Sequence, residues 1–311
     1  MIHKKPVILL IALAFILLLF SACSPSNGGT SGSSITVLQL LQNSSSAMNK
    51  LKSAQIDVKA SGSGQALTSS TATPTTSSAK PTINNVTFSL TGNGDEALPN
   101  EEAMQFNVTQ NITNDTSKLA QVVQGDKIYI QNTKGQWYVL DKSVLKGYVD
   151  NPFSGINNSD LSLLIGLLQH TKITDNGVES LNGQNLRHIT IALDQVALKQ
   201  FMSNNQQLVD VLGQQNLNTI IDHTKAFNST VDLWIDETTF YIHRTELKFN
   251  LSADTSTLAQ YLTPTVTTVL VPSNITTKFD SIVDLSKFNE PVTITVPTGA
   301  IPTNDPTVVF G

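Results

Sequence analysis

The chain has 311 residues, a formal net charge of −5 and only 14% charged residues, with no basic run outside its first residues. This composition argues against nucleic acid as a partner, because surfaces that bind nucleic acid concentrate Lys and Arg. The charged fraction is also well below the ~25% of an average soluble domain. Ser, Thr, Asn and Gln take the place of the missing charges, as is common in exported and β-rich proteins.

The first residues have the order of a secretory signal peptide. Residues 3–5 are positively charged or His, residues 7–20 form an unbroken apolar run, and small residues then precede Cys23. The apolar run is shorter than the ~20 residues that a membrane-spanning helix needs. Cys23 is the only cysteine of the chain.

The ending Phe20-Ser21-Ala22-Cys23 resembles the bacterial lipobox, with Phe20 where Leu is usual. In that kind of signal the thiol is diacylated, with palmitate as one such acyl group, and the peptide is cut before the cysteine. We therefore expect a signal peptide over residues 1–22 and lipid attachment at Cys23. Two acyl chains give stable anchoring, since each buried CH₂ contributes ~0.8 kcal/mol. The expected location is the extracytoplasmic face of a bacterial cell membrane. An ordinary cleaved signal with a chance cysteine and an uncleaved anchor are the alternatives.

After Cys23, residues 23–34 are rich in Ser and Gly and predict a flexible tether. Residues 35–52 place apolar side chains at helical spacing, and Thr36 can cap that helix. Residues 55–60 alternate like a half-buried strand. Residues 61–81 are Ser-, Thr- and Pro-rich without periodicity, and predict a disordered loop insertion.

Alternating segments then predict antiparallel strands with one buried face. The first two cover residues 86–90 and 104–108, with a turn at 93–95 between them. Residues 119–131, split by a turn at 125–126, are followed by a turn and a strand over 136–140, which predicts a hairpin.

The middle of the chain changes character. Residues 161–170, LSLLIGLLQH, predict a helix that is apolar almost all round, so it must be covered on most sides or border a cavity. A strand at 186–191 precedes two further helical stretches, over 195–202 and from 207 to at least 212.

The last part predicts more strands. Residues 231–236 and 240–251 face each other across a turn at 237–239, and a bulge near Arg244 would reconcile the apolar positions on the two sides of it. Further strands are expected over 276–285 and 291–296, followed by a loose tail over 300–311.

From Ser44 to Pro297 the chain resembles the LppX/LprA/LprG family of lipid-binding lipoproteins, within the wider LolA-like group. The resemblance implies one α+β domain over residues 35–299. Its fold would be a highly curved antiparallel β-sheet, an unclosed half-barrel, with helices packed on the concave face and an apolar cavity for acyl chains between them. The segments that carry the resemblance are Met48 to Ala54, Gly125 to Tyr129 with Gln136 to Tyr138, Val178 to Gly183 before His188, Leu233 to Asp236 before Arg244, and Pro291 to Ile294.

The sequence predicts neither an enzyme nor a cofactor or metal site. The five histidines have no His-x₃-His spacing and no cysteine beside them, and no nucleophile elbow or phosphate loop occurs. Asp222 with His223 and Glu179 could serve as acid–base partners, and Asp232 with Asp236 could flank a metal. Surface and turn roles are the interpretation that we favour for all five.

The expected ligand is lipid, in addition to the membrane that the N-terminal anchor would enter. We expect Leu163, Leu164, Leu167 and Leu168 to line or gate the lipid cavity, opposite Trp234 or its strand neighbours, in a protein that transports or presents lipid. In the alternative, the same leucines fill a dry core. An envelope sensor or scaffold that uses this fold for a protein partner, and a surface hydrolase, are the competing functions.

Overall fold

The computed structural model describes residues 35–68, 82–111, 116–144, 171–196, 218, 222, 224–254 and 274–305. Cys23, the tether and the four leucines at 163–168 lie outside the described residues. So do the helix expected over 161–170 and most of the two that follow it. The predictions about them stay predictions.

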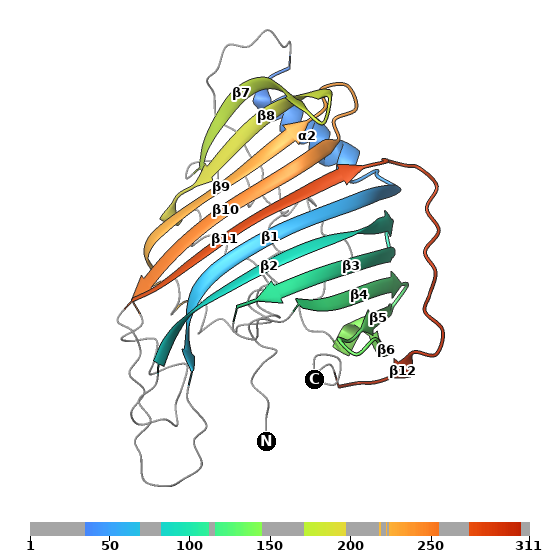
Figure 1. Cartoon of the computed structure of the whole chain (residues 1–311). Helices are drawn as coiled ribbons and strands as arrows, with labels where there is room; N and C mark the ends of the chain where they lie inside the picture. Colours follow the sequence, from blue (N-terminus) through green and yellow to red (C-terminus); the bar gives the residue numbers. More distant parts are fainter. Residues whose placement is uncertain are drawn as a thin grey trace.

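The described strands form one twelve-stranded sheet, which is curved and unclosed (Figure 1). Its order is β12-β6-β5-β4-β3-β2-β1-β11-β10-β9-β8-β7, and neighbouring strands are antiparallel except β12 and β6. The strands are β1 (Ser53–Thr68), β2 (Thr82–Ala97), β3 (Glu101–Gln110), β4 (Thr116–Gln124), β5 (Lys127–Gln131), β6 (Trp137–Asp141), β7 (Thr171–Leu181), β8 (Gln184–Leu193), β9 (Thr224–Ile235), β10 (Ile242–Asp254), β11 (Asn274–Ser286) and β12 (Ile301–Pro302).

The path of the chain explains why β1 lies inside the sheet. The strands from β1 to β6 follow one another to one edge, and β7 then begins at the opposite edge. Strands β8 to β11 return from there until β11 pairs with β1 (Figure 1). One continuous sheet therefore joins residues from Ser53 to Pro302.

Helix α2 (Val37–Met48) is the one complete α-helix among the described residues, and it packs against the sheet. Thr36 caps it as predicted, because its hydroxyl accepts from the Gln39 amide while the Gln39 side chain accepts from the Thr36 amide. Leu40, Leu41 and Met48 are buried in the same cluster as the strands. Among the helices that the structure describes, none has the length and apolar character to cross a bilayer.

The turn predicted at residues 93–95 is wrong, because β2 continues through it and the chain turns after Ala97. Gly92 and Gly94 are glycines for a different reason. A Cβ at Gly92 would lie 2.5 Å from Cδ1 of Phe106, and one at Gly94 would lie 2.5 Å from Sδ of Met104. The side chains of β3 thus occupy the space above the glycines of β2.

The loop predicted from residue 61 begins later than expected. Strand β1 continues to Thr68 and pairs with β2 as far as Thr82. Residues 61–68 lack apolar alternation because Gly62 and Gly64 interrupt it, so the pattern hid this half of the strand. Residues 69–81 lie outside the described part.

Strand β7 was missed, because it lies at an edge of the sheet and Ile173 is its one buried apolar residue. At the other end of the chain, residues 291–296 are not a strand. The tail expected from residue 300 instead begins with β12, which pairs with Tyr138 and Val139 of β6.

Several local predictions are confirmed. The register between β9 and β10 shifts between Ile242 and Arg244, which is the expected bulge. The hairpin turns fall at 237–239 and 125–126. In each case the deciding signal was a local change of parity or a turn residue.

Candidate functional site

The sheet has one apolar face, which we call the inner face. It carries every second residue of the strands, because successive side chains of a strand point to opposite sides. Helix α2 lies against this face. The main buried cluster includes Ile56, Val58, Ala60, Leu90, Val108, Ile189, Ile191, Val231, Leu233, Leu247 and Val283, contributed by seven strands.

Four phenylalanines form a band across the inner face. Phe249 and Phe279 are direct partners on β10 and β11. Phe227 meets Phe249 edge to face with ring centroids 5.4 Å apart, and the rings of Phe88 and Phe279 are 6.2 Å apart. The ring of Phe88 lies over Gly62, where no side chain intervenes on β1. Phe88 and Phe227 are only partly buried, so the band keeps accessible aromatic surface.

Two glutamates interrupt the apolar inner face about eight residues along β2 from Phe88. Glu96 and Glu102 are direct cross-strand partners on β2 and β3. Their flanking partners are Ala54 on β1 and Val123 on β4, both buried. Glu96 is only 2% exposed, and its Oε2 has no hydrogen-bond partner.

Burial makes ionisation of both carboxyls unfavourable. Burial, and next the charge of Glu102, raise the pKa of Glu96 from an ordinary 4.5 to about 8. Burial raises the pKa of Glu102 to about 7, against the hydrogen bond that Gln121 donates and the charge of Lys142. At neutral pH the pair therefore holds at least one proton.

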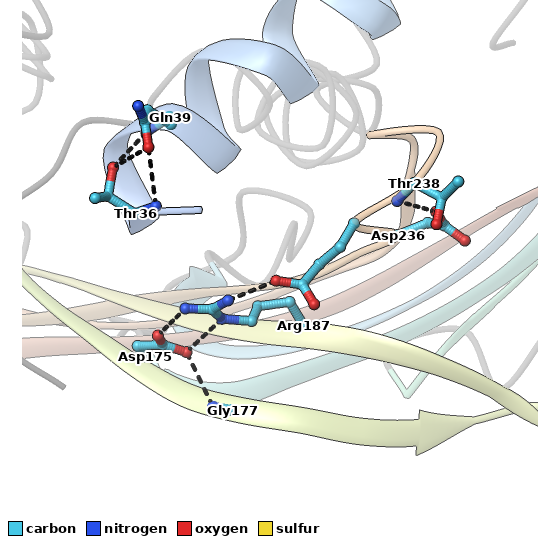
Figure 2. A network of polar contacts seen from close by, with 8 residues as sticks. Thr36, Gln39, Asp175, Gly177, Arg187, Asp236 and Thr238 are labelled. Carbon is cyan, nitrogen blue, oxygen red and sulfur yellow. Dashed lines mark hydrogen bonds and ion pairs between the residues drawn. The ribbon is translucent and has the colours of Figure 1, made fainter. Parts of the chain in front are cut away.

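In a second polar cluster on the inner face, a buried positive charge is paired with negative charges (Figure 2). Arg187 of β8 donates from Nε and Nη2 to both carboxylate oxygens of Asp175, at 2.9 and 2.5 Å, and from Nη1 to Glu237 at 2.5 Å. Asp175 also accepts from the Gly177 amide, where β7 bulges. The side chains of Arg187 and Asp175 are each only 3% exposed. A buried cation bound on both sides in this way has a structural role.

Trp234 lies on the opposite, outer face. Its neighbours Leu233 and Ile235 belong to the buried cluster, whereas Trp234 does not. The indole stacks on His188 with centroids 4.2 Å apart and donates from Nε1 to Glu179 at 3.2 Å. Arg244 lies over the same ring at 5.9 Å. The structure thus brings Trp234 together with polar side chains, and its strand neighbours with the inner face.

Among the side chains weighed as acid–base or metal groups, Glu179, Asp232 and Asp236 have local partners, and His223 lies outside the described residues. His188 lies 3.0 Å from Glu179 by Nδ1 and 3.0 Å from Asp232 by Nε2, and Thr190 also donates to Asp232. Asp236 instead accepts from the backbone amides of residues 238 and 239, each at 2.7 Å, and so closes the hairpin turn. Within the described ranges no group of three His, Cys, Asp or Glu is arranged to hold a metal ion.

Sequence reasoning missed the two glutamates, although a signal was present. Glu102 shares the even-numbered parity of Met104, Phe106 and Val108, which marks the buried side of β3. Glu96 has the same parity as Leu90 on β2, but the false turn at 93–95 broke that reading.

The solved structures to which the chain is similar include one lipoprotein. LppX from Mycobacterium tuberculosis is 15% identical, with 82% of this chain and 96% of that chain covered at a TM-score of 0.36. LprF from Mycobacterium bovis is 14% identical, with 84% and 96% covered at 0.40. A domain from Vibrio parahaemolyticus assigned to outer membrane lipoprotein sorting is 10% identical, with 82% and 92% covered at 0.21.

LppX bears the name of the family that the sequence resembles. The TM-scores of the three structures are all below 0.5, so they assign no residue of this chain to a role. No family model and no curated protein matches the chain.

Proposed function

We propose that the chain is a bacterial lipoprotein, anchored at the extracytoplasmic face of the cell membrane through Cys23, that binds lipid acyl chains on the inner face of its sheet. It acts without catalysis, as a carrier or presenter of lipid. The observation that carries the proposal is the extended, largely apolar inner face with its partly accessible phenylalanine band.

The size of this face supports the proposal. With ~4.8 Å between neighbouring strands, twelve strands span on the order of 50 Å. Helix α2, with 12 residues, is about 18 Å long and about 10 Å wide, so it covers a fraction of that width. The rest of the face needs an apolar cover, since an exposed apolar surface of this extent is unfavourable in water.

We propose that this cover comes from further helices on the concave side, with acyl chains held beneath them. Leu163, Leu164, Leu167 and Leu168 are the side chains that would line or gate the bound lipid. The opposing wall would include Leu233 and Ile235, the strand neighbours of Trp234 that reach the inner face. Each methylene buried there would contribute ~0.8 kcal/mol.

Lipid binding is tested by native mass spectrometry of the full-length chain. The protein is extracted from its own membrane in detergent, and the detergent is removed in the spectrometer. The expected spectrum has a non-covalent lipid adduct in addition to the covalent mass at Cys23. A photoactivatable alkyl probe should label inner-face peptides such as those holding Phe88 and Phe249. A spectrum with no adduct, together with no labelling of these peptides, would overturn the proposal.

The anchor is tested separately by Cys23→Ala. The variant should lose incorporation of an alkynyl palmitate analogue and leave the membrane fraction, because the thiol is the attachment point. Substitution of the neighbouring Ser24 by Ala should change neither readout. Retention of the label in the Cys23 variant would contradict lipid attachment at that residue.

A further inference from the structure

The two glutamates of the inner face have no structural role that their surroundings explain. Glu96 and Glu102 face each other between Ala54 and Val123, in a row that continues into Ile128 and Leu140. Every other member of that row is apolar and at most 2% exposed. A carboxyl pair in such a row costs stability relative to apolar side chains of similar size.

Their polar atoms are also incompletely matched. Buried carboxyl oxygens are almost always hydrogen-bonded, yet Oε2 of Glu96 is buried and has no partner. Glu102 accepts one hydrogen bond, 3.1 Å long, from the side-chain amide of Gln121. Against the effect of burial, the positive charge of Lys142 lowers the pKa of Glu102.

The chemistry of the two carboxyl groups indicates which ligand groups could hydrogen-bond to them. Its free acceptor capacity suits a group that donates hydrogen bonds, and its negative charge on ionisation favours a cationic donor over a neutral one. The same charge disfavours phosphate, sulfate or carboxylate groups. The pair lies on the face proposed to hold acyl chains, so an amphiphile could reach it with its polar end.

We propose that Glu96 and Glu102 form the polar end of the lipid site and accept hydrogen bonds from the amino or hydroxyl head group of a bound amphiphile. This inference rests on the proposed function, since it places a head group at one end of the acyl-binding face. It adds a selectivity: amphiphiles with donor head groups bind there in preference to anionic ones.

The experiment uses the full-length chain reconstituted into phosphatidylcholine vesicles. Three photoactivatable probes with the same alkyl chain, ending in an amine, an alcohol or a carboxylate, are added in turn at pH 8.5, above the pKa values of both glutamates. Labelling of inner-face peptides is then quantified by mass spectrometry. For the native chain we expect the amine to label about tenfold more than the carboxylate, the factor that one charge-assisted hydrogen bond supplies, with the alcohol between them.

The E96Q/E102Q variant should fold, because each amide reproduces the shape of a protonated carboxyl, and it should label equally with all three probes. The matched control is E101Q, since Glu101 is the next residue of β3 and faces the other side of the sheet. It should keep the native preference.

The outcomes separate the two proposals. Equal labelling of the native chain by amine and carboxylate, or a preference that survives in E96Q/E102Q, would overturn the head-group inference and leave acyl binding standing. A change in preference that appears equally in E101Q would also overturn it. Absence of inner-face labelling by every probe would overturn the proposed function itself, and this inference with it.

Discussion

The inner face of the sheet holds two buried clusters of acidic side chains. They differ in whether the carboxyl groups have partners that balance their charge. In the first, the guanidinium of Arg187 binds both oxygens of Asp175 and one oxygen of Glu237. In the second, Glu96 and Glu102 face each other, and Oε2 of Glu96 has no partner. The two clusters belong to opposite wings of the sheet, β7–β9 and β2–β3.

The difference separates a structural cluster from a binding site. The hydrogen bonds that Arg187 donates to Asp175 raise the pKa of Arg187 against the effect of burial, so the first cluster remains charged and connected. In the second cluster burial raises the pKa of both carboxyls. A buried polar pair that the fold leaves unmatched is therefore available to a ligand, whereas a matched one is not.

The largest expected effect comes from removing the cation of the first cluster. Arg187→Met should lower the free energy of unfolding by about 3–5 kcal/mol, because Asp175 stays buried without its guanidinium. Urea unfolding followed by fluorescence measures the change. The double variant Asp175→Asn with Arg187→Met should recover at least half of the loss. If Arg187→Met unfolds at the same midpoint urea concentration as the native chain, the first cluster has no structural role.

The second cluster should show itself in the pH dependence of stability. The pKa of Glu96 is about 8 in the folded chain and near 4.5 when unfolded, so the folded state binds the proton more tightly. The stability that this tighter proton binding contributes is fully present below pH 4.5. It is lost as the pH rises through 8, at up to about 1.4 kcal/mol per pH unit.

Glu102 adds a loss of the same sign up to its own pKa of about 7. Urea unfolding from pH 5 to pH 8.5 should therefore show falling stability in the native chain and a flatter profile in Glu96→Gln. Equal slopes in the two proteins would contradict the burial of an ionisable Glu96.

A third test concerns the packing of β2 against β3 on the inner face. Gly92→Ala should cost about 1–3 kcal/mol, because the added Cβ meets the ring of Phe106 at 2.5 Å and the backbone oxygen of Gln105 at 3.0 Å. Gly64→Ala is the control, since its Cβ would lie 3.7 Å from Oγ1 of Thr277, an ordinary contact. Thermal unfolding compares them, and equal melting temperatures would show that β3 adjusts freely.

The smallest effect is expected at the rim of the first cluster. Glu237→Gln should cost about 1 kcal/mol or less, because Glu237 is 29% exposed and the amide oxygen still accepts from Arg187. Urea unfolding of this variant beside Arg187→Met measures how the cluster divides its stabilisation. A loss as large as that of Arg187→Met would show that Glu237, rather than Asp175, holds the guanidinium.

Much of the fold could be predicted from the sequence, because local patterns specify it. Alternating residues predicted β9, β10 and β11, and the change of parity between Ile242 and Leu247 predicted the bulge. The capping pair Thr36 and Gln39 marks the helix start. The candidate site was harder to predict. Some of its residues are remote in sequence, and others lie in sequence patterns that fit more than one structure.

Glycine is the clearest example of such a signal. Gly94 between polar residues reads as a turn, yet in the structure it lies within β2 beneath Met104. Trp234 or its strand neighbours were expected opposite the leucines of the lipid cavity, and the strand register places Trp234 itself on the outer face against His188. The apolar residues on both sides of Trp234 could not decide its face, because a shift of the strand register by one residue exchanges the two faces of the sheet.

The sequence by itself determined most of the strands, the start of the helix and the alternation of apolar residues within those strands, because these depend on neighbours within a few residues. Only the tertiary structure decided what meets across strands. It placed Glu96 opposite Glu102 and enclosed Arg187 between Asp175 and Glu237, up to 50 residues away. Burial and pairing, which set the pKa values and the matched or unmatched state of each carboxyl, exist only once distant strands have assembled into one sheet.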